Sequence, residues 1–183
     1  FETVTVVRKG MVDHSDSLSA AGRYGNGDVQ WMTAGKGVNH AEMFPLLNRK
    51  KENPLELFQI WLNLPASKKM VEPDYKMLWS EQIPTHKHKD ENGYNTKIEI
   101  IAGEIENNVA PRPPVNSWAN EATSDVAIWN IIMDSNAEYH IPKSSKGVNR
   151  VLYVYEGEGL SIEDNEVDNY HSVELNPEED IKI

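Results

Sequence analysis

The feature that most constrains the fold is an alternation of apolar and polar residues over short stretches that end at glycine, proline or asparagine. The stretch Leu57 to Leu64 shows it most clearly, because Phe58, Ile60 and Leu62 fall on one face and a mixed set that includes Gln59 falls on the other. Successive side chains of a β-strand point to opposite faces, so this pattern predicts a half-buried strand whose mixed face is a candidate pocket lining. Helical periodicity is nearly absent. We therefore expect an all-β fold of the sandwich type.

Other short stretches predict further strands of the same kind. They are rich in β-branched or aromatic residues and are bounded by turn residues such as those of Gly25 to Asp28. In chain order they are Thr3–Val7, Met11–His14, Val29–Thr33, Ile98–Ile101, Asp125–Met133, Val151–Tyr155 and Leu160–Ile162. Residues 66–84 contain two prolines and no sustained period, which predicts an irregular linker that wraps the first domain.

Composition limits the class of function. The chain has 183 residues, enough for one large or two small domains, and its formal net charge of −11 argues against direct binding to nucleic acid or to anionic membranes. It has no cysteine, which excludes disulfides and thiolate sites and fits a reducing compartment. No apolar run is long enough to span a bilayer. We therefore expect a cytoplasmic location.

The chemistry-bearing stretch runs from Gly27 to Glu42. His40 and Glu42 are two residues apart, so on a strand both side chains point to the same face and can converge on one ion. An imidazole and a carboxylate suit Fe, Mn, Zn, Ni or Cu. Gly35 and Gly37 supply the backbone freedom to turn the chain toward this pair. The alternative interpretation of the pair is an exposed polar strand face.

The residues around this pair carry a family resemblance. The segment Asp28 to Gly37, followed by His-Ala-Glu-Met at residues 40–43, resembles the signature block of the pirin family in the cupin superfamily. The similarity begins at Phe-Glu-Thr-Val, residues 1–4, and continues through Gln59 to Pro65 and Lys69 to Tyr75. The resemblance implies a bicupin, a pair of double-stranded β-helix sandwiches. We expect residues 1–84 to form the N-terminal cupin with the metal site and residues 85–183 to form a structural C-terminal cupin.

The resemblance also implies a metal site with one iron ion, three histidines and one glutamate. The last two of these ligands match His40 and Glu42, while the first two belong to a His-Pro-His segment that precedes the Phe-Glu-Thr-Val motif. His86 and His88 have a suitable spacing to substitute for them, although a solvated loop between the domains is the alternative interpretation. Glu2 ranks behind Glu42 as a ligand.

His14, followed by Ser-Asp-Ser, is expected to be a turn or surface histidine rather than a ligand. Trp31 is expected in the core, whereas Gln30 either reaches the site or satisfies a backbone group.

Two functions follow from the resemblance. The first is an enzyme of the quercetin 2,3-dioxygenase type, in which His40 and Glu42 bind the metal and Glu42 also acts as the base for a flavonol hydroxyl. The second is a non-catalytic, iron-dependent redox regulator that binds a transcription factor or a metabolic enzyme. The third alternative is a metal-free fragment without activity. Because pirins continue past the equivalents of both ends of the chain, we expect further residues or a neighbouring chain to cover open sheet edges.

Overall fold

The computed structural model describes residues 1–183 as an almost entirely β-stranded chain, which confirms the all-β prediction. The chain divides into two compact units: unit 1 comprises Phe1–Pro84 and Ile100–Ile128, and unit 2 comprises Thr85–Glu99 and Trp129–Ile183. The expected boundary at residue 84 coincides with one of these divisions. Residues 100–128 were expected in the second domain, but they return to unit 1 because Ile101 and Ala102 pack into its core.

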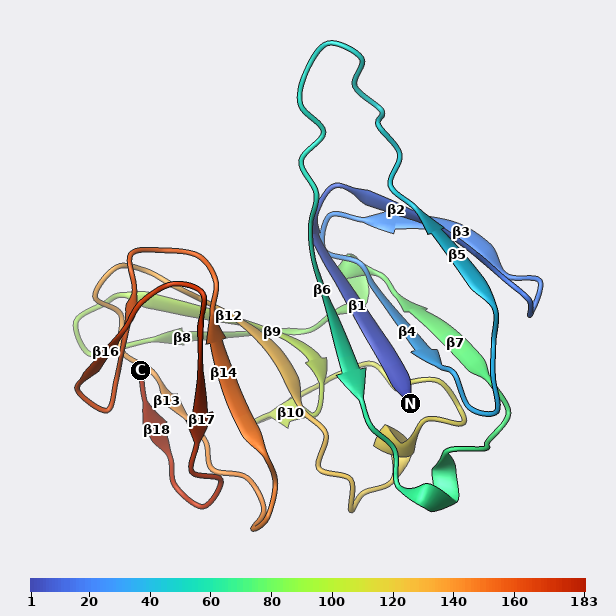
Figure 1. The fold of residues 1–183 in the computed structure, drawn as a ribbon. Coiled ribbons are helices and arrows are strands. Elements are labelled where there is room, and N and C mark those ends of the chain that lie inside the picture. The colour runs from blue at the N-terminus through green and yellow to red at the C-terminus, as the bar shows by residue number, and fades with distance from the viewer. The chain divides into compact units, whose positions relative to one another are not determined.

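Unit 1 contains most of the long strands (Figure 1). Its strands are β1 (Glu2–Lys9), β2 (Met11–Asp16), β3 (Ala21–Gly25), β4 (Val29–Thr33), β5 (His40–Met43), β6 (Glu56–Leu62), β7 (Asp74–Leu78), β10 (Glu104–Ile105) and β11 (Asn108–Val109). Its 3-10 turns are η1 (Ala66–Lys68), η2 (Ser80–Gln82) and η3 (Trp118–Asn120). Two of its sheets have the strand orders β6-β1-β4-β7 and β3-β2-β5.

The connection between β1 and β2 moves the chain from one of these sheets to the other. The sequence predicts a returning strand after Gly10, and β2 does form there, but it pairs with β3 and β5 instead of β1. Gly10 has a φ of 84°, and a Cβ at this position would lie 2.4 Å from the carbonyl oxygen of Pro54. Only glycine fits this crossing, because both the positive φ and the backbone contact exclude a side chain.

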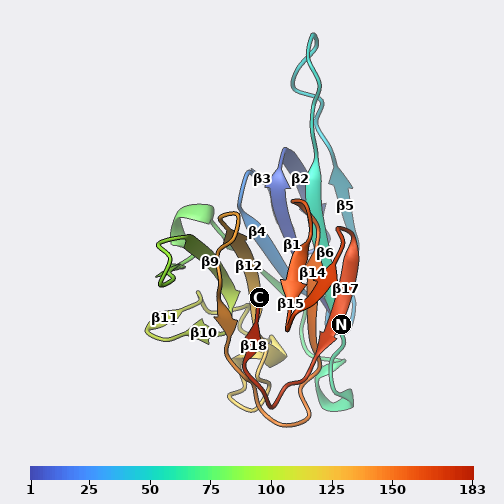
Figure 2. The same cartoon turned by 90° about the vertical axis from the view of Figure 1, so that its left-hand side faces the viewer.

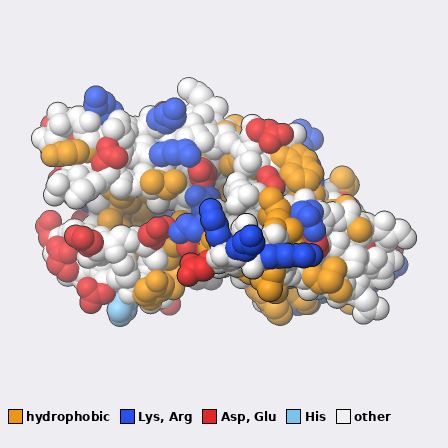
Figure 3. All heavy atoms as spheres, turned by 90° about the horizontal axis from the view of Figure 1, so that it is seen from above, with side chains coloured by type: hydrophobic (Ala, Val, Ile, Leu, Met, Phe, Trp, Pro, Cys, Tyr) orange, Lys and Arg blue, Asp and Glu red, His pale blue; other side chains and the backbone are white.

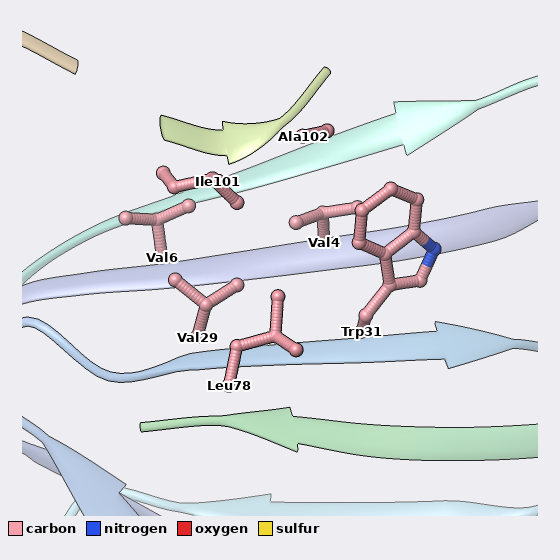
Figure 4. Packing of buried hydrophobic residues seen from close by; sticks show 7 residues of the cluster. All are labelled: Val4, Val6, Val29, Trp31, Leu78, Ile101 and Ala102. Atoms are coloured by element: carbon pink, nitrogen blue, oxygen red, sulfur yellow. The ribbon is translucent and has the colours of Figure 1, made fainter. Parts of the chain in front are cut away.

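One of the two core clusters of unit 1 lies on one face of the four-stranded sheet, and a smaller one around Val7, Val12 and Tyr24 lies on the other side of β1. Val4 and Val6 of β1 alternate with Thr3 and Thr5, so the apolar pair faces one side and the threonines face the other. A cluster of fully or nearly buried side chains forms on the apolar side (Figure 4): Val4, Val6, Val29, Trp31, Leu78, Ile101 and Ala102. The core position expected for Trp31 is confirmed by its exposure of 0%.

The expected linker at residues 66–84 is wrong in part. Residues 74–78 form β7, which pairs antiparallel with β4 and buries Leu78 completely. The sequence did not predict this strand because it is only five residues long and prolines lie on either side of it, at positions 73 and 84. Tertiary pairing with β4 completes the backbone hydrogen bonds that the local sequence does not predict.

Unit 2 is built from shorter strands. They are β8 (Thr85–Lys89), most of β9 (Asn95–Ala102), most of β12 (Ile128–Met133), β13 (His140–Ile141), β14 (Arg150–Val154), β15 (Leu160–Ile162), β16 (Asn165–Val167), β17 (His171–Leu175) and β18 (Ile181–Lys182). The solvated-loop interpretation of His86 and His88 is wrong, since both lie on β8 and His86 is buried. Their rings lie 6.2 and 5.3 Å from the ring of Tyr139. No helix of the structure is long and apolar enough to cross a bilayer.

Candidate metal centre

The pairing of β2 with β5 brings four chemistry-bearing side chains together. In this ladder His14 lies directly opposite Glu42, and Asp16 lies directly opposite His40. Directly opposed residues of an antiparallel pair share a face, with Cβ atoms about 4.5–5.5 Å apart. The rings of His14 and His40 are nearly parallel, with centroids 5.6 Å apart. Two imidazoles and two carboxylates therefore form a compact square on one face of the β2–β5 ribbon.

His14 and Asp16 form the buried half of this square. Their side chains are 1% and 0% exposed, and His14 Nε2 lies 2.9 Å from Asp16 Oδ2. The other oxygen of Asp16 accepts hydrogen bonds from the backbone N–H groups of Leu18 and Ala20. Burial raises the pKa of Asp16, but the hydrogen bonds from His14 and from the two amides outweigh it and hold the pKa below its usual value.

The remaining ring nitrogen of His14 distinguishes this side chain from an ordinary core histidine. Nδ1 is buried and has no hydrogen-bond partner. When Nε2 donates to the Asp16 carboxylate, the neutral imidazole presents Nδ1 as an unprotonated acceptor. A histidine oriented by a carboxylate in this way is typical of the surroundings of metal ions. The expected turn or surface role of His14 is wrong, and its position two residues after the core residue Val12 was the signal that it faces inward.

Tyr24 ties the ribbon to the four-stranded sheet. Its hydroxyl donates to Glu42 Oε1 at 3.4 Å, and burial, together with the charge of Glu42, raises the pKa of Tyr24 despite an opposing hydrogen bond from Thr5. Tyr24 therefore stays protonated and holds one oxygen of Glu42. Tyr75 of β7 also lies near the square, with its ring 6.0 Å from that of His14. Neither tyrosine was among the predicted site residues, because only the strand pairing brings them here.

The mixed face of β6 lies in register with the threonine face of β1. Gln59 is paired with Thr5 and donates to its hydroxyl at 3.5 Å, and Trp61 donates to Gln59 at 2.9 Å. Gln30 pairs with Thr5 from the other side and is buried. The residues of this face that we expected to line a pocket thus form a polar surface around Thr5, which in turn contacts Tyr24.

Glu2 has a separate, structural role. It is fully buried, and its carboxylate accepts from Trp31 Nε1 at 2.5 Å, from Ser117 Oγ at 2.7 Å and from the backbone N–H of Trp118 at 3.0 Å. On β1 it shares the face of Val4 and Val6, away from Thr3 and Thr5. Three donors occupy this carboxylate, which supports ranking Glu2 behind Glu42 as a metal ligand.

The corner before β5 depends on Gly35. Its φ is 52°, and a Cβ there would lie 2.1 Å from the carbonyl oxygen of Val71, which already accepts from the N–H of Lys36. Gly37 has a φ of 130°, but a Cβ would meet open space. Both glycines therefore have a positive φ, but only at Gly35 would a side chain also clash with the backbone.

The donor chemistry fits part of a metal site. His40 is exposed and Glu42 is half-buried on one strand, and the orphaned Nδ1 of His14 lies in the same square. No three His, Asp or Glu side chains of residues 1–183 are arranged to hold an ion together. His40 and Glu42 are the two residues of the described chain that match ligands implied by the family resemblance.

Comparison with solved structures defines the class of protein. The chain matches a quercetin 2,3-dioxygenase from Acinetobacter baumannii over 100% of its length and 59% of that chain, with 29% sequence identity and a TM-score of 0.78. A Geobacillus kaustophilus protein matches with 27% identity over 99% of this chain and 68% of its own, at a TM-score of 0.75. The fold is thus a cupin-type β-sandwich.

Sequence comparison points in the same direction. Residues 1–62 match the Pirin family model, and curated pirins and pirin-like proteins are similar to this chain. It is 42% identical to human Pirin over 118 residues, which are 62% of this chain and 37% of the relative. It is 31% identical to a Pirin-like protein of Solanum lycopersicum over 100% of this chain and 57% of the relative. The chain therefore spans between about a third and three fifths of the lengths of these relatives.

Proposed function

We propose that this chain carries the metal-site half of an oxidoreductase of the quercetin 2,3-dioxygenase type, with a flavonol-like aromatic substrate and iron as the cofactor. The observation that supports it best is the square of His14, Asp16, His40 and Glu42 on the β2–β5 ribbon. The name of the Acinetobacter baumannii relative supports the substrate class.

Each residue of the square has a role in this proposal. His40 and Glu42 are metal ligands, and a bound iron ion would offer open coordination positions to the substrate and to O₂. Glu42 also accepts the proton of the flavonol hydroxyl. Tyr24 donates to Oε1 of Glu42 and so leaves Oε2 for the ligand and base roles. His14, held by Asp16, supports the orientation of the neighbouring His40 ring.

The test measures metal content and turnover on the same samples. The iron-loaded protein should consume quercetin, seen as loss of its visible absorbance with uptake of O₂, and His40→Ala should lose both bound iron and turnover. Glu42→Gln should lose turnover more completely than iron, because the amide can still coordinate through oxygen but is no base. His140→Ala is the matched control, since His140 is an exposed histidine of unit 2 and should change neither quantity.

Two outcomes would contradict the proposal. An iron-loaded sample that leaves quercetin unchanged rejects the enzyme, and iron binding that survives His40→Ala rejects the site. The alternative function is an iron-dependent regulator, for which the exposed acidic surface of the chain is compatible with a protein partner. An inactive sample that captures a partner only in its ferric or only in its ferrous form would favour that alternative.

A further inference from the structure

The loop between β5 and β6, residues 44–55, exposes an unusual combination of side chains. It projects beyond the strands of unit 1 in both views (Figures 1 and 2). Phe44, Leu46 and Leu47 are 51%, 76% and 55% exposed, and Met43 at the end of β5 is 62% exposed. Single exposed apolar residues are common on protein surfaces, but a contiguous group is typical of an interaction site.

The tip of the 44–55 loop is basic and has a defined shape. Arg49, Lys50 and Lys51 are consecutive and exposed. The side chain of Asn53 closes the turn around them, since it accepts from the N–H of Asn48 at 2.8 Å and donates back to the carbonyl of Asn48 at 2.9 Å. Figure 3, which looks at the molecule from above, shows Lys and Arg side chains gathered beside hydrophobic ones. A held turn loses less conformational entropy on binding than a free one.

The order of these residues indicates the kind of partner. Apolar residues that insert into a bilayer need to lie at the outermost point, with cations behind them at the headgroup level. In the 44–55 loop the cations lie at the tip, and the apolar side chains of Phe44, Leu46 and Leu47 lie nearer the strands. This arrangement fits an acidic protein surface that has an apolar cleft beside it.

Unit 2 of the same chain has such a surface. A cleft of about 250 Å³ is lined by apolar side chains of β15 to β18, namely Ile162, Val167, Val173, Leu175 and Ile181, with Glu163 and Glu174 also in its lining. Both glutamates are exposed. Residues 151–183 contain ten acidic residues and one basic residue. The cleft is therefore apolar inside and strongly acidic around its rim.

We propose that the 44–55 loop of one chain docks into the acidic cleft of unit 2 of a second copy. Leu46 and Leu47 fill the apolar interior, and Arg49, Lys50 and Lys51 face the rim carboxylates. Charge complementarity carries the choice of a second copy, because the chain is acidic as a whole and this loop holds its one run of three consecutive basic residues. The proposal is independent of the metal site and of the dioxygenase function.

Charge reversal tests the docking. In low salt, light scattering with gel filtration should give twice the mass of one chain, and the mass should fall toward one chain as the Debye length shrinks from about 30 Å at 0.01 M to about 3 Å at 1 M salt. Arg49→Glu, Lys50→Glu and Lys51→Glu together should give monomers, as should Glu163→Lys with Glu174→Lys. A mixture of these two variants should restore the double mass, because each reversed surface then meets its complement.

Two control variants accompany this test. Lys87→Glu, Lys89→Glu and Lys143→Glu produce the same change of net charge on exposed sites of unit 2 and should leave the mass doubled. Glu174→Lys alone spares the hydrogen bond from Lys182 N to Glu163 and should still weaken association if the double variant misfolds. A chain that is monomeric at low salt, or association that survives both reversals, would overturn the proposal. So would loop-dependent sedimentation of a monomeric chain with phosphatidylserine vesicles, which would identify a lipid partner instead.

Discussion

Replacing Glu2 by glutamine tests whether the hydrogen bonds to its buried carboxylate stabilise unit 1. The substitution keeps the size of the side chain and exchanges one acceptor oxygen for an NH₂ donor. In wild type, Oε2 accepts from Trp31 and Ser117, and Oε1 accepts from the N–H of Trp118. In the best orientation the glutamine oxygen keeps the first two bonds. Its NH₂ group then faces the Trp118 N–H, so two donors oppose each other inside a fully buried site.

The magnitude follows from those two unsatisfied donors. Leaving a buried donor without a partner costs about 1–3 kcal/mol, so two such donors in Glu2→Gln should lower the free energy of unfolding by about 2–6 kcal/mol. Small proteins have total stabilities of about 5–15 kcal/mol, so such a loss is easily measured. Ser117→Ala removes a single hydrogen bond to a charged acceptor and should cost less, about 1.5–3 kcal/mol.

The assay is urea unfolding followed by tryptophan fluorescence and by far-UV circular dichroism. Trp31 and Trp118 both lie at the Glu2 carboxylate, so fluorescence follows unit 1 directly. Glu91→Gln is the matched control, because Glu91 is exposed and its substitution should change stability by no more than about 0.5 kcal/mol. If Glu2→Gln is as stable as Glu91→Gln, the three hydrogen bonds to the buried Glu2 carboxylate do not stabilise unit 1, which would refute this prediction.

Three further predictions concern the corner, the tyrosine and an acidic turn. Gly35→Ala should destabilise unit 1 more than Gly37→Ala in the same urea assay, because both strain a positive φ but only Gly35 also clashes with a backbone oxygen; equal losses would contradict the structure. Tyr24 should ionise at higher pH than ordinary tyrosines in an absorbance titration, and Glu42→Gln should lower its pKa by removing the neighbouring charge; an unchanged titration would show that the two groups do not interact. Burial raises the pKa of Asp90, but backbone N–H groups outweigh it and hold the pKa below the ordinary value of 3.8. The stabilisation from Asp90 is therefore complete above about pH 4 and is lost as the pH falls through the lowered pKa. Asp90→Asn should be less stable than wild type at pH 7, and the two stabilities should converge in acid. A stability difference that does not shrink in acid would contradict this prediction.

The candidate site shows which of its residues the spacing in the sequence can predict. His40 and Glu42 are recognisable as candidate ligands because both residues lie on one strand, where a spacing of two residues determines that they share a face. His14 lies 28 residues before Glu42 and Asp16 lies 24 residues before His40, and only the register of β2 against β5 places each pair opposite one another. A shift of that register by one residue would turn both side chains to the other face. The sequence around His14 contains no information about which strand lies beside it.

The same distinction applies to Glu2 and to the unit boundary. That a glutamate follows Phe1 on an apolar strand is evident from the sequence, but its donors come from Trp31 and from residues 117 and 118, which no local pattern connects to it. Residues 100–128 were expected in the second domain because they follow residue 84 in the chain. They belong to unit 1 because Ile101 and Ala102 complete its core, and burial of apolar area outweighs proximity in sequence.

The amino-acid sequence by itself determined the all-β class, the strand that carries His40 and Glu42, the turn before β4 and the resemblance to pirins, because each of these depends on residues close together in the chain. The tertiary structure decided which strands pair and that residues 74–78 form a strand. It also placed His14, Asp16 and Tyr24 beside His40 and Glu42, and it buried the Glu2 carboxylate among three hydrogen-bond donors. These features depend on contacts between distant segments, which form only when the sheets pair and bury their apolar faces.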